Sequence, residues 1–173
     1  ENLKLSPEDV VLLATATAYH DIGHAPLSHV GDEVLKHYGR GTHEERAIEA
    51  IGTYVDPTYA QKLGDIILEK PGLGQILKVI DTLAYLRIDL PEAGIKLSLP
   101  DLPSLFPTHI GLDKESGYLR VDEIGKQALK DLLNARADAY GLFYTHPNSL
   151  ALEAMHIKAL RILIDAGKFD TED

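Results

Sequence analysis

Histidine and aspartate residues cluster near the N-terminus of this 173-residue chain. Five of its eight histidines fall in one short region that also contains Asp21 and Asp32, namely His20, His24, His29, His37 and His43. For any single one of them, an exposed helix position is a sufficient explanation. A dense group of imidazoles and carboxylates is instead typical of a metal centre or an acid–base site, because both groups ligate divalent cations and imidazole exchanges protons near neutral pH. We therefore expect chemistry in this region.

The adjacent pair His20 and Asp21 is the first candidate for metal binding. Neighbouring side chains on a regular helix diverge by about 100°, so both reach one ion only where the backbone leaves helical geometry. Gly23 and Pro26 provide such a break directly after the pair. Imidazole nitrogen and carboxylate oxygen suit a divalent metal ion such as Mn, Fe, Mg or Zn. The sequence thus predicts a divalent metal ion at this pair, with a further ligand from elsewhere in the chain.

Asp81 is the best candidate for that further ligand. It lies in the largely apolar run 76–83, where an unpaired buried carboxylate would be costly. Periodicity alone leaves two interpretations open. Asp81 either faces inward and needs a partner such as a metal ion, or it lies on a solvated face together with Lys78, one helical turn away.

Helices must position these residues. The first expected helix begins at Ser6, whose hydroxyl caps it ahead of Pro7, and ends near Gly23. Its apolar residues are spread almost all round, so we expect it to be buried in the centre of the domain. His20 and Asp21 would then lie at its C-terminal end.

Further helices are expected along the rest of the chain. They run from about 27 to 38, 42 to 51, 56 to before 71, 74 to 89, 123 to 144 and 148 to 166. The helix at 42 begins with a capping box of Thr42 and Glu45. The helix that carries Asp81 has an expected buried face of Ile76, Leu77, Ile80, Leu83, Ala84 and Leu86.

Two segments are not expected to be regular helices. Residues 96–107 contain three prolines and should form a loop over the core. Residues 109–112 and 118–121 are expected to pair as a β-hairpin. The predicted fold class is therefore mainly α, a single-domain helical fold with one small β-hairpin.

Composition narrows the function. Hydrophobic residues make up 45% and charged residues 25%, as in an ordinary globular domain. No apolar run is long enough for a membrane span, and the N-terminus lacks a signal-peptide layout, so we expect a soluble, cytoplasmic protein without a membrane partner. The absence of cysteine excludes disulfides, iron–sulfur clusters and cysteine nucleophiles. A net charge of −10 disfavours sequence-independent binding to nucleic acid unless the few basic residues cluster, and leaves room for a small anionic substrate beside local cations. We expect no sequence-specific nucleic-acid binding.

Residues 18–29 read AYHDIGHAPLSH. This run resembles the HDxGHxPxSH signature of the HD superfamily of metal-dependent phosphohydrolases, in particular its deoxynucleoside triphosphate triphosphohydrolase (dGTPase-like) branch. The resemblance continues at THE (42–44), at DTLAYLRID (81–89) and at YTHPNSL (144–150), and it covers nearly the whole chain.

The resemblance implies a set of site residues. His20 and Asp21 match the central metal-binding doublet, and Asp81 matches the distant aspartate that completes the metal site. Catalytic and phosphate-contacting positions, where a histidine paired to an acid assists the attacking water or the departing oxygen, fall at His24, His29, His43 and Asp32.

The resemblance also implies a substrate. Tyr85 and Asp89 match positions that contact the nucleoside sugar, and His146 lies in a segment near the nucleotide pocket, although capping is its commoner role beside a helix break. The implied activity is hydrolysis of a deoxynucleoside triphosphate to nucleoside and tripolyphosphate, by a possible homo-oligomer. The alternatives are an HD-type nucleotidase or phosphodiesterase, and a non-catalytic module that binds a nucleotide or a partner protein.

The chain departs from the family pattern at two positions. The residue after the metal-binding aspartate is often a lysine that grips phosphate, and here it is Thr82. A first metal-binding histidine, on a helix well upstream of the doublet, has no counterpart because the chain begins at Glu1. We therefore expect residues 1–173 to be a single HD-type phosphohydrolase domain that lacks its N-terminal helix or helices. Cations available for phosphate, none of them assigned, are Lys36, Arg46, Lys158 and Arg161.

Overall fold

Helices dominate the structure, a computed structural model that describes residues 5–106, 108–113 and 115–171. Its elements in chain order are α1 (Pro7–Tyr19), α2 (His29–His37), α3 (His43–Gly52), α4 (Pro57–Ile67), α5 (Leu73–Glu92), α6 (Leu102–Leu105), β1 (Ile110–Leu112), β2 (Leu119–Val121), α7 (Glu123–Ala139), the π-helix η1 (Tyr140–Tyr144) and α8 (Pro147–Asp165). The predicted mainly α fold with a small hairpin is confirmed.

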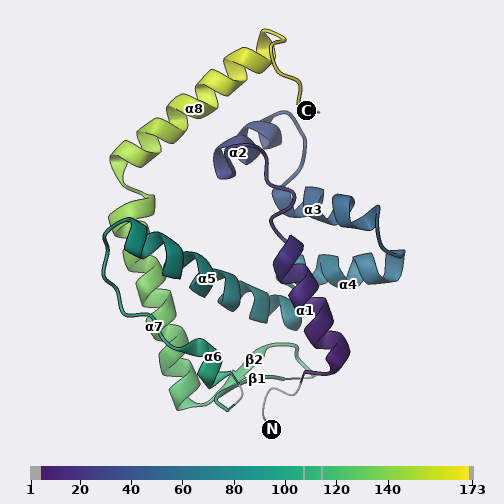
Figure 1. The fold of residues 1–173 in the computed structure, drawn as a ribbon, viewed down its shortest axis with the longest axis vertical. Coiled ribbons are helices and arrows are strands. Elements are labelled where there is room, and N and C mark those ends of the chain that lie inside the picture. Colours follow the sequence, from purple (N-terminus) through teal and green to yellow (C-terminus); the bar gives the residue numbers. More distant parts are fainter. Residues whose placement is uncertain (1–4, 107, 114, 172–173) are drawn as a thin grey trace.

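Helix α5 is the central element, with α1 and α4 near its first half and α7 near its second (Figure 1). It joins two hydrophobic clusters. Its first half packs with α1 and α4, burying Leu12, Leu63 and Ile76. Its second half packs with α7, burying Leu86 and Leu132 among others. Asp81 lies on α5 between the last buried α5 residue of the first cluster and the first of the second, where the apolar packing is interrupted.

The hairpin forms as predicted. Strands β1 and β2 are antiparallel, with Ile110 opposite Val121 and Leu112 opposite Leu119. The turn is stabilised by Asp113, whose carboxylate accepts hydrogen bonds from the backbone N–H of Ser116 and of its neighbour at 115. Lys114 lies outside the described residues, as does Pro107 of the predicted loop.

Four expectations about burial and regularity are wrong. Helix α1 is not buried all round, because it packs on α4 and α5 with one side and leaves Val10 52% and Val11 56% exposed. On α5, Ala84 is exposed, and the helix runs beyond its predicted end to Glu92. The proline-rich loop contains the short helix α6.

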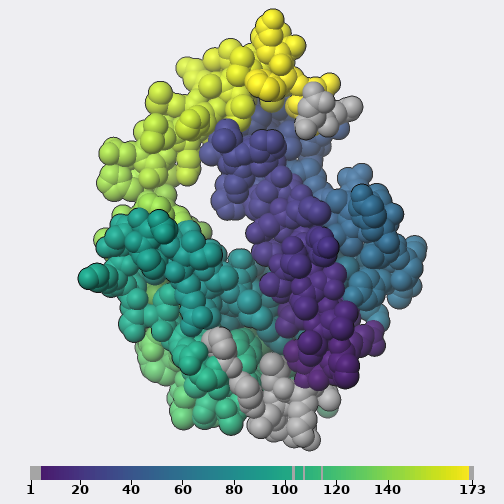
Figure 2. Space-filling view, viewed as in Figure 1, coloured from purple at the N-terminus to yellow at the C-terminus, as the bar shows by residue number. Residues whose placement is uncertain are grey.

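The C-terminal part of the chain also differs from expectation. The predicted helix 123–144 is α-helical only to Ala139, and η1 then continues with wider hydrogen bonding, as in the 3.0 Å bond from the Thr145 N–H to the Tyr140 carbonyl. Helix α8 follows and crosses back to α2, with which it makes its main contacts. In the space-filling view an opening remains between α8, α2 and α5 (Figure 2). None of the helices in the described part of the chain combines the length and the apolar character that crossing a bilayer needs.

Candidate metal centre and its cavity

His20 and Asp21 lie where α1 stops being a helix. The His20 N–H still bonds the Ala16 carbonyl at 2.8 Å, but the following residues form turns, closed by a 3.0 Å bond from the His24 N–H to the Asp21 carbonyl. The sequence predicted the end of this helix near Gly23, after the doublet, whereas α1 ends at Tyr19, so the break begins at the doublet itself. It allows two consecutive side chains to point to the same place, with His20 Nε2 3.3 Å from Asp21 Oδ2.

Asp81 completes the group from α5. Its Oδ1 lies 3.3 Å from His20 Nε2, although the two residues are 61 positions apart in the chain. Asp81 thus has the partner that the first interpretation required, but its side chain is 40% exposed, and Lys78 lines the same cavity, paired with Glu69. One ligand atom from each of His20, Asp21 and Asp81 lies within 4.8 Å of the other two, a spacing suited to one metal ion.

The imidazole of His20 is oriented for ligation. Its Nδ1 lies 3.0 Å from the Thr17 carbonyl, so it donates there and presents Nε2 to the carboxylates. Metal-binding histidines usually have such a backbone partner on the second ring nitrogen. The hydrogen bond with Asp81 and the charge of Asp21 raise the pKa of His20 against the opposing effect of burial. The negative potential that favours a proton on this nitrogen favours a divalent cation in the same way.

A second group of side chains centres on Asp32. The carboxylate of Asp32 is 12% exposed and is bonded to His24 Nδ1, to the Ala25 N–H at 3.0 Å and to the guanidinium of Arg46. Burial raises the pKa of Asp32, but these hydrogen bonds and the adjacent charges outweigh it and bring the pKa below its usual value. Asp32 therefore stays ionised and holds His24 with Nε2 turned to Asp21, at 3.4 Å from Oδ1.

Three imidazoles lie side by side next to this carboxylate. His43 stacks on His24 with ring centroids 4.0 Å apart, and His29 meets His24 edge-on at 4.9 Å. Burial lowers the pKa of His43 despite the neighbouring charge of Glu44, 3.3 Å from its Nε2. His29 remains 84% exposed and is free to contact a ligand.

Aromatic residues and Asp89 form the other end of the same region. Tyr144 donates a hydrogen bond of 2.5 Å to Asp89, and burial and this bond both raise the pKa of Tyr144. Arg136 donates to the Tyr85 hydroxyl at 2.9 Å and lies over the Tyr140 ring, 4.7 Å from its centroid. Tyr140 and Tyr144, at the two ends of η1, both line the cavity.

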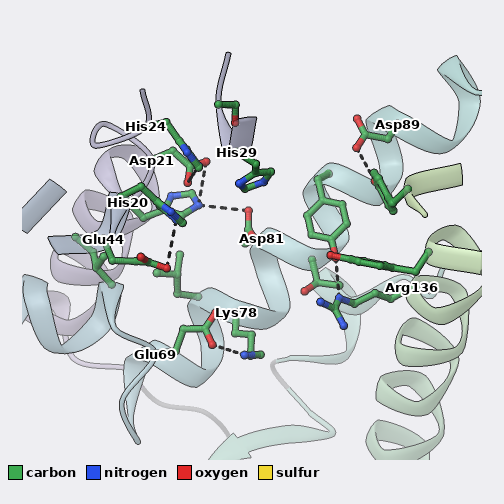
Figure 3. A pocket seen from close by; sticks show the side chains of 18 of the residues that line it. His20, Asp21, His24, His29, Glu44, Glu69, Lys78, Asp81, Asp89 and Arg136 are labelled. Carbon is green, nitrogen blue, oxygen red and sulfur yellow. Dashed lines mark hydrogen bonds and ion pairs between the residues drawn. The ribbon is translucent and has the colours of Figure 1, made fainter. Parts of the chain in front are cut away.

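One cavity of about 790 Å³ joins the two ends (Figure 3), a size within the range of about 300–1,000 Å³ typical of small-molecule sites. The predicted site residues in its lining are His20, Asp21, His24, His29, His43, Asp81, Tyr85 and Asp89. Asp32 lies behind His24 and is not in the lining. His146 is not in the lining either, and its Nδ1 accepts the Asn148 N–H as the N-cap of α8.

The sequence did not identify the cations of this cavity. None of the four candidates Lys36, Arg46, Lys158 and Arg161 is in its lining, whereas Lys78 and Arg136 are. Arg46 instead lies behind the histidines, on Asp32. For Lys78 the sequence offered one indication, its position one helical turn before Asp81. For Arg136 it offered none, because this side chain reaches the cavity through the packing of α7 on α5.

Comparison with known proteins gives distant relatives. No family model matches the chain. Over 99 residues, 49% of this chain and 29% of the relative, it is 31% identical to a deoxyguanosinetriphosphate triphosphohydrolase-like protein of Caldanaerobacter subterraneus subsp. tengcongensis. Over 160 residues, 86% of this chain and 36% of the relative, it is 24% identical to the uncharacterized protein YwfO of Bacillus subtilis. The chain thus spans about a third of the length of these relatives.

Proposed function

We propose that this chain forms the HD-type site of a metal-dependent phosphohydrolase that converts a deoxynucleoside triphosphate to a nucleoside and tripolyphosphate. The observation that carries the proposal is the meeting of His20, Asp21 and Asp81 at 3.3 Å contacts between segments 61 positions apart. The name of the Caldanaerobacter relative, a deoxyguanosinetriphosphate triphosphohydrolase-like protein, supports the substrate class.

The donor set fits a divalent cation. One imidazole nitrogen and two carboxylates are ligands that Mn, Fe, Mg and Zn accept, and His20, Asp21 and Asp81 would hold the ion. When bound, such an ion supplies Lewis acidity and lowers the pKa of water from about 15.7 towards neutrality. The chain orients the ligands for it, through the Thr17 carbonyl behind His20.

The histidines beside the metal site are suited to move protons. In the proposed reaction a water oxygen attacks the α-phosphorus, the bond from that phosphorus to O5′ breaks, one proton leaves the water, and O5′ gains a proton as the nucleoside departs. His24 or His29 would carry out one of these transfers, which are typically worth about 10²–10⁴-fold in rate. The Asp32 carboxylate orients His24 for this role.

The opposite end of the cavity is suited to the nucleoside. We propose that Tyr85 and Asp89 contact the sugar, as the family resemblance implies. Tyr140 and Tyr144 offer aromatic faces beside them, and Arg136 adds a positive charge. Bases bind well to such faces because stacking buries apolar surface without demanding a particular hydrogen-bond pattern.

Metal analysis of the natural protein followed by a nucleotide panel tests this function. We expect a bound divalent ion, and equal amounts of nucleoside and tripolyphosphate from a deoxynucleoside triphosphate. Chelation should abolish the reaction and Mn²⁺ should restore it. Asp21→Ala and Asp81→Ala should lose metal and activity while keeping the helical circular-dichroism signal, whereas the exposed Asp138→Ala serves as the matched control. Unchanged hydrolysis in the first two variants would contradict the proposal.

Thr82 favours a second candidate. It is 9% exposed and places no positive charge beside Asp81. A nucleoside monophosphate or a phosphodiester carries less negative charge than a triphosphate and needs fewer cations, so an HD-type nucleotidase or phosphodiesterase would fit this position. Release of orthophosphate or of a nucleotide, rather than tripolyphosphate, in the same panel would select it.

A further inference from the structure

The cavity has a large excess of negative charge. Among the described residues, its lining contains the carboxylates of Asp21, Glu44, Glu69, Asp81, Asp89 and Glu153. Against these six stand two permanent cations, Lys78 and Arg136. A polyphosphate adds several negative charges, and a divalent ion compensates only two of them. Such a ligand would therefore need charge-assisted hydrogen bonds from both Lys78 and Arg136.

Lys78 is the cation on the metal side of the cavity. It precedes Asp81 by three residues on α5, so the two side chains leave the same face of the helix. Figure 3 shows Lys78 and Glu69 beneath Asp81, whereas Arg136 lies further along the cavity, on the side of Asp89. A phosphate chain that starts at the metal site therefore meets Lys78 before Arg136.

The ammonium group of Lys78 has a replaceable partner. It is paired with Glu69, and the side chains of the two are 63% and 45% exposed. Exposed ion pairs contribute little to stability, since both charges stay solvated. A phosphoryl group carries up to two negative charges and several acceptor oxygens, so it competes well with one carboxylate.

Glu69 is held at the cavity by its backbone. It has a positive φ of 53°, and its Cα would lie 2.8 Å from a Cβ on Gly74, in the first turn of α5. This close packing sets Glu69 beside the helix that carries Lys78. The carboxylate thereby pairs with Lys78 at the edge of the cavity, where the lysine side chain remains largely solvated.

We propose that Lys78 is a specificity-determining residue that binds a phosphoryl group of the substrate's polyphosphate, and that Glu69 holds its ammonium group in place until the substrate displaces it. This inference rests on the proposed function and names the residue that selects triphosphates over monophosphates. It also supplies, one turn earlier on α5, the positive charge that Thr82 does not provide.

Kinetics and direct binding on the natural protein test the role of Lys78. We expect Lys78→Ala to raise KM for a deoxynucleoside triphosphate about tenfold to hundredfold, as for loss of a hydrogen bond from a charged group, with little change in kcat. By calorimetry, the affinity for inorganic tripolyphosphate should fall by a similar factor, and that for orthophosphate much less. Lys78→Arg should retain most affinity, and Glu69→Gln should tighten tripolyphosphate binding a few-fold.

Lys62→Ala is the matched control, because Lys62 forms a comparable ion pair with Glu8, at 2.6 Å, outside this cavity. If Lys78→Ala behaves like Lys62→Ala while the natural protein hydrolyses triphosphate, the role of Lys78 is wrong and the proposed function stands. If the natural protein binds metal but hydrolyses no nucleotide, the proposed function fails, and tripolyphosphate binding still decides the role of Lys78. Lys78→Gln replaces Lys78→Ala should the latter lose helical content.

Discussion

Arg46 organises the histidine cluster from behind. Its side chain is 19% exposed, and its Nε donates to the Gly23 carbonyl at 2.8 Å, Nη1 to the Gly41 carbonyl at 3.0 Å, and Nη2 to Asp32. One planar guanidinium thus ties α3 to the turn after the doublet, to the loop before α3 and to the carboxylate that orients His24. A lysine cannot replace it, because an ammonium group lacks this fork of fixed donors.

Replacing Arg46 should therefore destabilise the protein and disturb the site together. We expect Arg46→Ala to lower the free energy of unfolding by about 2–3 kcal/mol, since it leaves a partly buried carboxylate without its cation. Arg46→Lys should recover only part of this loss. Urea denaturation measures both, and the exposed Arg87→Ala on α5 should change stability by less than about 0.5 kcal/mol. Equal stability of Arg46→Ala and Arg87→Ala would show that the network does not hold the fold.

At the scale of single residues, the sequence predicted those site positions that local spacing marks. A helix break beside His20 and Asp21, and an interruption of the apolar run at Asp81, could both be recognised in the sequence, and the structure brings these three side chains together. The supporting cations were not readable. Long basic side chains reach their partners across elements, as Arg136 reaches Tyr85 from 51 positions away, and no periodicity records such contacts.

The segment between α1 and α2 is the element that shapes the site. It approaches α3 so closely that a Cβ on Gly23 would lie 2.0 Å from the His43 carbonyl oxygen and 2.5 Å from the Ala47 nitrogen. Leu27 and Ser28 then adopt positive φ angles of 68° and 52°, which residues other than glycine rarely do. This unusual backbone separates α2 from the turn and brings His24 and His29 into ring contact.

Adding one methyl group at Gly23 should push the segment between α1 and α2 away from α3. Gly23→Ala is expected to destabilise the protein by about 1–3 kcal/mol, because backbone atoms of α3 cannot move aside as a side chain would. Gly52→Ala is the control, since Gly52 ends α3, meets nothing within 4 Å and should gain up to about 1 kcal/mol from the alanine. Denaturation midpoints compare the two, and a Gly23→Ala protein as stable as the unsubstituted one would contradict the close contact.

Element starts were more predictable than element ends. The caps at Ser6 and Thr42 both form their capping boxes, because each involves residues three positions apart. The start of α2 was predicted two residues early, since nothing local announces positive φ at Leu27 and Ser28. The change from α7 to η1 was not predicted either, and at η1 Tyr144 lies against Tyr85 of α5, with ring centroids 6.1 Å apart, a tertiary contact that no local pattern announces.

At the scale of the whole molecule, α8 returns to α2 beside the opening seen in Figure 2. The Tyr38 hydroxyl donates to Asp165 at 2.6 Å, between residues 127 positions apart. Helix α8 has no fully buried residue, and Leu152, Met155 and Ile162 are more than half exposed. A closure to which α8 contributes no fully buried side chain could not be predicted from the amphipathic pattern of either helix.

Removing the Tyr38 hydroxyl should loosen this closure selectively. In Tyr38→Phe, we expect amide hydrogen exchange in α8 to become several-fold faster while exchange in α5 stays unchanged, because α5 is anchored in both hydrophobic clusters. Tyr54→Phe, at a side chain that is 88% exposed, controls for loss of a hydroxyl. Unaltered exchange in α8 would mean that other contacts fasten it.

The asymmetry between α8 and α5 has a mechanical consequence for the cavity. Leu150 and Glu153 border it from α8, whereas Asp81 and Tyr85 border it from α5. One wall is thus anchored in both hydrophobic clusters, and the other belongs to a helix without a fully buried residue. We therefore expect Asp81 to keep its place beside His20 when a ligand enters, and any change in the width of the cavity to come from α8.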